Sequence, residues 1–165
     1  MLNETLRAAA HAGDLQAVQK MIARGAEIDC FDGLYQTPLH VAIAQRHFLV
    51  ADLLIAAGAD VNAQRNPGYS NSPLHLAICL DAREGIDERT QYLLFRGADL
   101  ARRAWIGIGK LTEQGDALAQ AQSQPDGKGA KLAALIASWQ EDRARLRLRQ
   151  IMLRQRADMK KGLKL

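Results

Sequence analysis

The side chains best suited to metal binding, acid–base work or nucleophilic attack are four histidines and two cysteines, scattered along the chain: His11, His40, His47, His75, Cys30 and Cys79. No His-Glu-x-x-His pair occurs, and neither cysteine stands at a metal-ligand spacing from a histidine or from the other cysteine. We therefore expect no metal site. Two cysteines without a CxxC pair are typical of reduced thiols, which favours a cytoplasmic protein.

A short glycine-rich stretch beginning at Gly107 has part of the spacing of a phosphate-binding loop. Such a loop needs glycine at position 104 and serine or threonine at 111, but the chain has Ala104 and Leu111. No Gly-x-Ser-x-Gly elbow is present, and the sequence places no serine or cysteine beside a base. The sequence therefore predicts no cofactor and no enzyme.

Arginines dominate the C-terminal part of the chain. Residues 139–165 hold nine Lys or Arg against three Asp or Glu, a net charge of +6; since the whole chain is +4, residues 1–138 carry −2. Guanidinium groups pair readily with phosphate, so six arginines are candidate contacts for an anionic partner: Arg143, Arg145, Arg147, Arg149, Arg154 and Arg156. No motif of a recognition helix, a base-stacking surface or a zinc finger accompanies them.

The same segment carries apolar side chains at helical spacing. Leu148, Ile151 and Met152 fall on one face, and Leu146 and Leu153 share another. These stripes fit packing on the rest of the chain, a helix–helix contact or oligomerisation as well as they fit an anionic partner. No apolar run approaches the roughly 18 residues of a membrane span, so we expect a soluble protein.

The elements that position these groups are predicted to be paired helices. Two of them begin with Ser or Thr followed by Pro, because the hydroxyl accepts an amide of the first turn and proline needs no partner there. Helices are expected at 3–12, 15–23, 38–45, 48–56, 73–80, 87–95, 113–122 and from 130 onward, with extended fingers at 26–36, 59–71 and 98–110. One helix is expected to continue to Gly162.

Two motifs repeat along the chain. Thr-Pro-Leu-His-Val-Ala-Ile at 37–43 recurs as Ser-Pro-Leu-His-Leu-Ala-Ile at 72–78. The run Gly-Ala-Asp-Val-Asn that begins at Gly58 has related copies at Gly97 and at Gly25, which lies 33 residues earlier. These motifs resemble the ankyrin repeat, a helix–turn–helix unit with a period of about 33 residues.

The resemblance implies an all-α ankyrin-repeat solenoid of about four units with a long basic C-terminal helix. The repeat domain would span 1–138, followed by a basic helical extension at 139–165, with repeats at about 1–31, 32–64, 65–104 and 105–138. It also implies that His40 and His75 bridge backbone groups of adjacent repeats. Ankyrin proteins commonly bind in the groove between fingers and first helices, which adds the candidate contacts Gln36, Gln45 and Leu80.

Leu34 and Tyr35 stand at a finger tip where the ankyrin pattern usually has a polar residue and a glycine. With Tyr69 and Trp105 on the following fingers they would form an aromatic row suited to a binding hot spot. Packing of one finger against the next would also explain them. Insertions at 66–71 and 81–87 are either contact loops or tolerated surface additions.

These features predict a non-catalytic cytoplasmic module that holds a protein partner, as an adaptor, scaffold, chaperone-like holder or inhibitor. The preformed groove would bind with little ordering cost. The alternative is nucleic-acid or anionic-surface binding through the arginine-rich helix.

Overall fold

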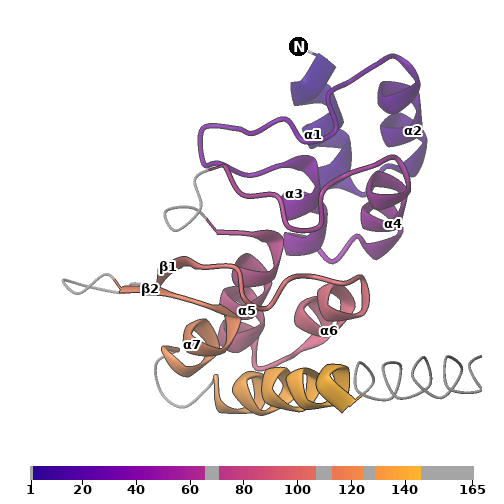
Figure 1. Cartoon of the computed structure of the whole chain (residues 1–165). Helices are drawn as coiled ribbons and strands as arrows, with labels where there is room; N and C mark the ends of the chain where they lie inside the picture. The colour runs from indigo at the N-terminus through magenta and orange to yellow at the C-terminus, as the bar shows by residue number, and fades with distance from the viewer. Residues whose placement is uncertain (1, 66–70, 107–112, 125–128, 146–165) are drawn as a thin grey trace, which may run out of the picture.

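The computed structural model describes residues 2–65, 71–106, 113–124 and 129–145. Within these ranges, helices follow one another in pairs that stack along one axis (Figure 1). The elements are α1 (Leu2–Ala12), α2 (Leu15–Ala23), α3 (Pro38–Ala44), α4 (Phe48–Ala56), α5 (Pro73–Glu84), α6 (Glu88–Phe95), β1 (Ala104–Ile106), β2 (Glu113–Gly115) and α7 (Ala117–Gln122). A further helical segment covers residues 130–145.

The helices form two layers. The first helices of successive pairs, α1, α3, α5 and α7, pack on one another in that order, and α2 packs on α4 in the second layer. The ring of Tyr92 on α6 stacks on Phe48 of α4, with centroids 4.7 Å apart, and continues this layer. The connections between pairs project to one side, at the left in Figure 1. The predicted stack of paired helices is confirmed.

The helix-start motif works as its residue types predict. Thr37 precedes α3, and its hydroxyl and the His40 ring form a reciprocal capping box, with Pro38 at the first helical position. The Thr37 amide donates to Nδ1 of His40 (3.1 Å), so the ring proton lies on Nε2, which donates to the Asn71 carbonyl (3.1 Å). His40 therefore bridges two repeats, as the resemblance implied.

Burial keeps the His40 ring neutral. The side chain is only 1% exposed, and the loss of solvation lowers its pKa to about 4. His75 occupies the matching place in the next repeat, where its Nδ1 lies 2.7 Å from Oγ of Ser72. Both histidines thus belong to the internal framework of the stack.

The core lies between the two layers. Leu39 and Leu74 of the two helix-start motifs are buried, and Ala42 and Ala77 are fully buried where neighbouring first helices meet. Because alanine has no bulk beyond its Cβ, these positions allow the helix backbones to approach closely. The core extends through every pair and ends on Leu132 and Ile136 of the segment 130–145.

The predicted loop at 81–87 is partly helical. The helix α5 continues through residues 81–84, four residues beyond its predicted end at 80. Its extra turn holds Asp81, which is fully buried and accepts hydrogen bonds from Nη1 of Arg89 (2.9 Å) and from the Thr90 amide (2.8 Å). The prediction was wrong for these four residues. The buried Asp81 carboxylate in the added turn of α5 accepts hydrogen bonds from the first turn of α6, and these bonds stabilise the added turn.

The third finger also differs from its prediction. Residues 104–106 pair with residues 113–115 in an antiparallel hairpin, with Trp105 opposite Gln114, where we expected a finger ending at 110 and a helix from 113. The helix α7 begins only at Ala117, because the Asp116 carboxylate caps it by accepting the Ala119 amide (3.0 Å).

The segment 130–145 packs Leu132 and Ile136 into the core, with Trp139 partly buried against it. The expected continuation of this helix to Gly162 lies outside the described residues, and the domain boundary at 138 stays a prediction. None of the described helices is long and apolar enough to cross a membrane.

Candidate protein-binding groove

The first finger ends in a tight turn organised by Asp32. Its carboxylate Oδ1 accepts hydrogen bonds from the amides of Leu34 and Gln36, both at 2.8 Å. The Tyr35 amide donates to the Asp32 carbonyl (3.1 Å), and the Asp32 amide donates to the Gln36 carbonyl (3.0 Å). One aspartate therefore fixes the backbone that presents Leu34 and Tyr35.

Tyr35 adopts a left-handed backbone conformation, with φ of 60°. This conformation costs a residue with a Cβ about 1–2 kcal/mol relative to the right-handed form, a cost that glycine avoids. The side chains at this tip stay in solvent, with Leu34 76% and Tyr35 44% exposed. The guanidinium of Arg65, from the next finger, lies 5.4 Å from the Tyr35 ring centre. The turn thus holds two apolar side chains outward at an energetic cost.

A cavity of about 440 Å³ lies beside this finger, between α1 and α3. Its floor consists of small or apolar residues, Ala8, Val41 and Ala44, and the predicted contacts Gln36 and Gln45 both line it. Side chains that sequence reasoning missed complete the lining: Glu4, Arg7, His11 and Asp32. Three of these four lie on α1, whose repeat motif is the weakest of the three, so the repeat pattern could not indicate which residues of α1 face the groove.

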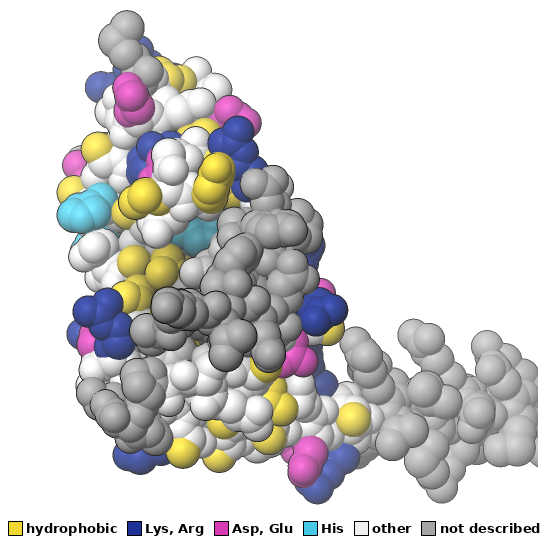
Figure 2. Space-filling view, turned by 90° about the vertical axis from the view of Figure 1, so that its left-hand side faces the viewer, with side chains coloured by type: hydrophobic (Ala, Val, Ile, Leu, Met, Phe, Trp, Pro, Cys, Tyr) yellow, Lys and Arg dark blue, Asp and Glu magenta, His cyan; other side chains and the backbone are white. Residues whose placement is uncertain are grey.

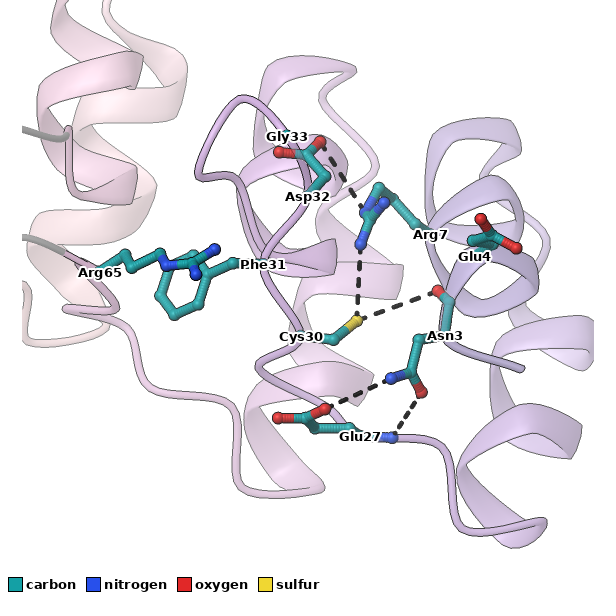
Figure 3. A pocket seen from close by; sticks show the side chains of 9 residues that line it. All are labelled: Asn3, Glu4, Arg7, Glu27, Cys30, Phe31, Asp32, Gly33 and Arg65. Carbon is teal, nitrogen blue, oxygen red and sulfur yellow. Dashed lines mark hydrogen bonds and ion pairs between the residues drawn. The ribbon is translucent and has the colours of Figure 1, made fainter. Parts of the chain in front are cut away.

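A second cavity, of about 560 Å³, adjoins the first and shares Glu4, Arg7 and Asp32 with it. Figure 3 shows its polar lining, in which Arg7 points between the first finger and α1. Asn3 accepts the Glu27 amide through Oδ1 (3.0 Å) and donates through Nδ2 to Glu27 Oε2 (3.3 Å). The two cavities form one groove with an apolar and a polar part, which we call the first-repeat groove.

The other predicted contacts lie elsewhere. Leu80 is half-buried on α5, and Trp105 lies in β1 on the third finger. On the finger side of the stack, hydrophobic, charged and histidine side chains are interspersed (Figure 2). Tyr69 lies outside the described residues, so the predicted aromatic row stays a prediction.

Two of the six candidate arginines fall in the described part of the chain. Arg143 is half-buried, whereas the Arg145 side chain is 76% exposed and lies 3.6 Å from Glu141 and 3.7 Å from Asp142. Four candidates lie outside the described residues: Arg147, Arg149, Arg154 and Arg156.

The groove offers binding chemistry of mixed character. Its apolar floor can accept a hydrocarbon side chain, while the glutamine amides, Arg7 and the carboxylates can hydrogen-bond a polar one. In the described part of the chain, histidine, cysteine and carboxylate side chains do not gather in threes as a metal ion would require. What the arrangement can offer a ligand is a complementary shape and hydrogen-bonding groups.

Comparison with known proteins adds a family. A family model described as ankyrin repeats (3 copies) matches residues 6–104, more than half of the 165-residue chain. An ankyrin repeat protein of Rickettsia felis is 40% identical over 52 residues, which are 32% of this chain and 82% of the relative.

Two larger relatives match only in part. A probable E3 ubiquitin-protein ligase of Oryza sativa subsp. japonica is 33% identical over 88 residues, 53% of this chain and 16% of the relative. The neurogenic locus Notch protein of Drosophila melanogaster is 38% identical over 68 residues, 41% of this chain and 2% of the relative. The chain thus spans a small part of either protein.

Proposed function

Because the chain belongs to the ankyrin-repeat family, whose repeats are generally protein–protein interaction modules, we propose that it holds a protein partner in its first-repeat groove. It does so without catalysis, as an adaptor, scaffold, chaperone-like holder or inhibitor. The observation that carries the proposal is the finger tip, where Tyr35 keeps a costly left-handed backbone while it and Leu34 remain exposed beside an open groove.

The energetic reasoning favours recognition at this tip. Local backbone strain persists where the surrounding structure enforces it, and it clusters at binding and active sites. Aromatic side chains bury large areas with few rotatable bonds, which makes them frequent hot spots in interfaces. Leu34 and Tyr35 would supply the apolar contact, and Gln36 and Gln45 would supply hydrogen bonds to the partner.

The test is affinity purification from the native cell lysate at low and high salt, using the full-length chain. We expect a discrete protein that is retained at high salt and lost when Leu34 and Tyr35 are both changed to alanine. Leu49→Ala is the matched control, because Leu49 is 69% exposed on α4 in the second layer, away from the groove. Equal loss with the control would contradict the proposal.

The alternative is binding of nucleic acid or another anionic surface through the basic C-terminal part. Arg145 offers it little support, because two neighbouring carboxylates on the same helix already offset its charge. Replacing the six candidate arginines by glutamine in the full chain tests this alternative. Recovery of nucleic acid at low salt only, and only with those arginines present, would favour the alternative over the groove.

We place this function in the cytoplasm, where ankyrin-type recognition and unoxidised cysteines are compatible. Cys30 and Cys79 are both thiols in the structure, and Cys30 is buried. A fluorescent fusion expressed in the native cell would test this location, and a signal confined to another compartment would contradict it.

A further inference from the structure

Arg7 stands at the centre of the first-repeat groove. It lies on α1 and lines both the apolar cavity and the polar cavity. Its side chain is 22% exposed, so most of its hydrocarbon stem is covered while the guanidinium reaches the groove. Figure 3 shows the guanidinium between Asp32 of the finger and Cys30. Any chain segment lying along the groove would pass this charge.

The bonds that Arg7 makes within the protein are weak. Its Nη2 donates to the sulfur of Cys30 at 3.7 Å, and its Nε lies 3.9 Å from Asp32 Oδ2, too far for a hydrogen bond. Among the described residues, the buried Nε has no hydrogen-bond partner at all. A guanidinium carries five N–H donors, and a desolvated charged donor without an acceptor costs free energy.

Two of the neighbouring carboxylates already make hydrogen bonds that hold the fold. Asp32 uses Oδ1 to hold the finger turn through the amides of Leu34 and Gln36. Glu27 accepts Asn3 Nδ2 at 3.3 Å on the far side of the polar cavity. Reorienting Asp32 toward Arg7 would release two backbone amides, so the fold itself does not readily complete the coordination of this guanidinium.

We propose that Arg7 recognises a single carboxylate, from an Asp or Glu side chain of the partner, and that an adjacent apolar side chain rests on Ala8, Val41 and Ala44. This inference rests on the proposed function and names the chemistry of the partner segment. A carboxylate fits a guanidinium through two parallel hydrogen bonds, which adds geometric selectivity to charge. The apolar floor adjoins Arg7 in the same cavity, so both parts engage one short segment.

The charges around Arg7 limit the ligand to one carboxylate. Glu4 and Asp32 line the same groove, and they would repel a run of acidic residues or a chain of phosphates. A single carboxylate meets one arginine, already partly offset by Asp32, and can approach without placing further negative charge beside Glu4. The groove therefore selects an isolated acidic residue next to an apolar one.

The experiment uses short random peptides displayed on phage and selected against the full-length chain. We expect enriched sequences that share one Asp or Glu at a fixed distance from an apolar residue. A synthetic peptide with the enriched sequence is then measured by fluorescence polarisation. Changing Arg7→Gln, or the peptide acid to its amide, should weaken binding by about tenfold or more. Once Arg7 is changed, the second change should have little further effect.

Two control variants test whether a loss of binding is specific to the guanidinium of Arg7. Arg24→Gln removes an arginine from the exposed end of α2, outside the groove, and should leave binding unchanged. Arg7→Lys keeps the charge without the bidentate fork and should give an intermediate loss; circular dichroism confirms that each variant is folded.

A peptide that depends on Tyr35 and Gln45 but not on Arg7 would overturn this inference and leave the proposed function standing. A peptide indifferent to Arg7, Tyr35 and Gln45 alike would overturn both. A selection without acidic consensus, or without any enriched binder, would also overturn the inference.

Discussion

At the level of single residues, Tyr35 occupies a position where its residue type does not favour stability. The left-handed backbone at this position suits glycine, yet the chain carries an aromatic ring that contributes little to the core. The Arg65 guanidinium near the ring offsets only part of the unfavourable free energy of this backbone conformation, since an exposed cation–π contact contributes about 0.5–1 kcal/mol. Folding stability alone therefore does not account for the residue type at this tip, and the proposed function supplies a reason for it.

Replacing Tyr35 by glycine should separate the two effects. We expect the free energy of unfolding to change by less than about 1 kcal/mol, because relief of the backbone conformation is offset by the greater freedom of the unfolded chain and by loss of the Arg65 contact. Binding of the partner or of the selected peptide should fall at the same time. Urea unfolding and fluorescence polarisation measure the two quantities. A variant that is both less stable and unchanged in binding would contradict this reading of Tyr35.

His40 makes stability depend on pH. Its pKa is about 4 in the folded chain against an ordinary value of 6.5, because burial disfavours the charged ring. As the pH falls below about 6.5, His40 is protonated in the unfolded chain, whereas in the folded chain it is protonated only near pH 4. Stability is therefore fully present above the ordinary value and is lost through this window, by about 3 kcal/mol in total.

The direct measurement is an NMR titration of the His40 ring protons, with urea unfolding at about pH 7 and about pH 4.5 as the second readout. The ring should stay neutral at the lower pH. His40→Gln should show a shallower fall of stability between these two pH values. A ring that titrates near its ordinary pKa of 6.5 would show that burial does not keep it neutral in the folded chain.

At the scale of elements, the added turn of α5 connects two repeats. Arg89 on α6 is only 3% exposed and donates through Nε and Nη2 to the Ala44 carbonyl at the end of α3, at 3.2 and 3.1 Å. The same side chain pairs with Asp81 (2.9 Å) and Glu84 (2.9 Å), which the added turn supplies. A positive charge at a helix C-terminus also interacts favourably with the helix dipole. The insertion is therefore a structural brace between the second and third repeats.

Arg89→Met should lower the free energy of unfolding by about 3–5 kcal/mol, because it leaves the buried Asp81 carboxylate without its charged partner. Arg46→Met is the matched control. Arg46 also approaches Glu84, at 3.5 Å, but its side chain is 43% exposed, so its loss should cost less than about 1 kcal/mol. Chemical unfolding followed by circular dichroism compares the two. Similar losses would indicate that the buried pair has no special role.

At the scale of the whole molecule, each repeat contacts mainly its neighbours along the stack, so stability is built from repeats and the interfaces between them. The last interface depends on Gly129, which lies against the end of α7. A Cβ added there would fall 1.7 Å from the Ala121 carbonyl oxygen, so the backbone must move to accommodate any side chain. This close approach joins α7 to the segment 130–145.

Gly129→Ala should therefore loosen the end of the stack before the rest. We expect amide hydrogens of α7 and of residues 130–145 to exchange faster, while those of α1 and α2 keep their protection. Hydrogen exchange followed by mass spectrometry resolves these regions. Equal acceleration along the whole chain would show that the molecule unfolds as one cooperative unit instead.

Residue types and their spacing predicted the helices of the first two repeats to within one residue, together with the helix-start motifs and the inward leucines and alanines. It also led to Gln36 and Gln45, which the structure brings to one cavity. These features follow from short-range rules: caps, prolines, apolar spacing and the repeat period act over a few residues. Signals of this kind can be recognised in the sequence without knowing which other helix or strand packs against the segment.

Three contacts could not be predicted before the elements were packed together. Arg7 meets Cys30 and Asp32, and Asp81 is buried beside Arg89. Residues 104–106 pair with residues 113–115. The physical reason is the same in each case. The stabilising contact joins different elements, and its free energy depends on how they pack. No local spacing of residues indicates that packing. Because the motif of the first repeat is weak, the groove between the first finger and α1 could not be predicted from the sequence.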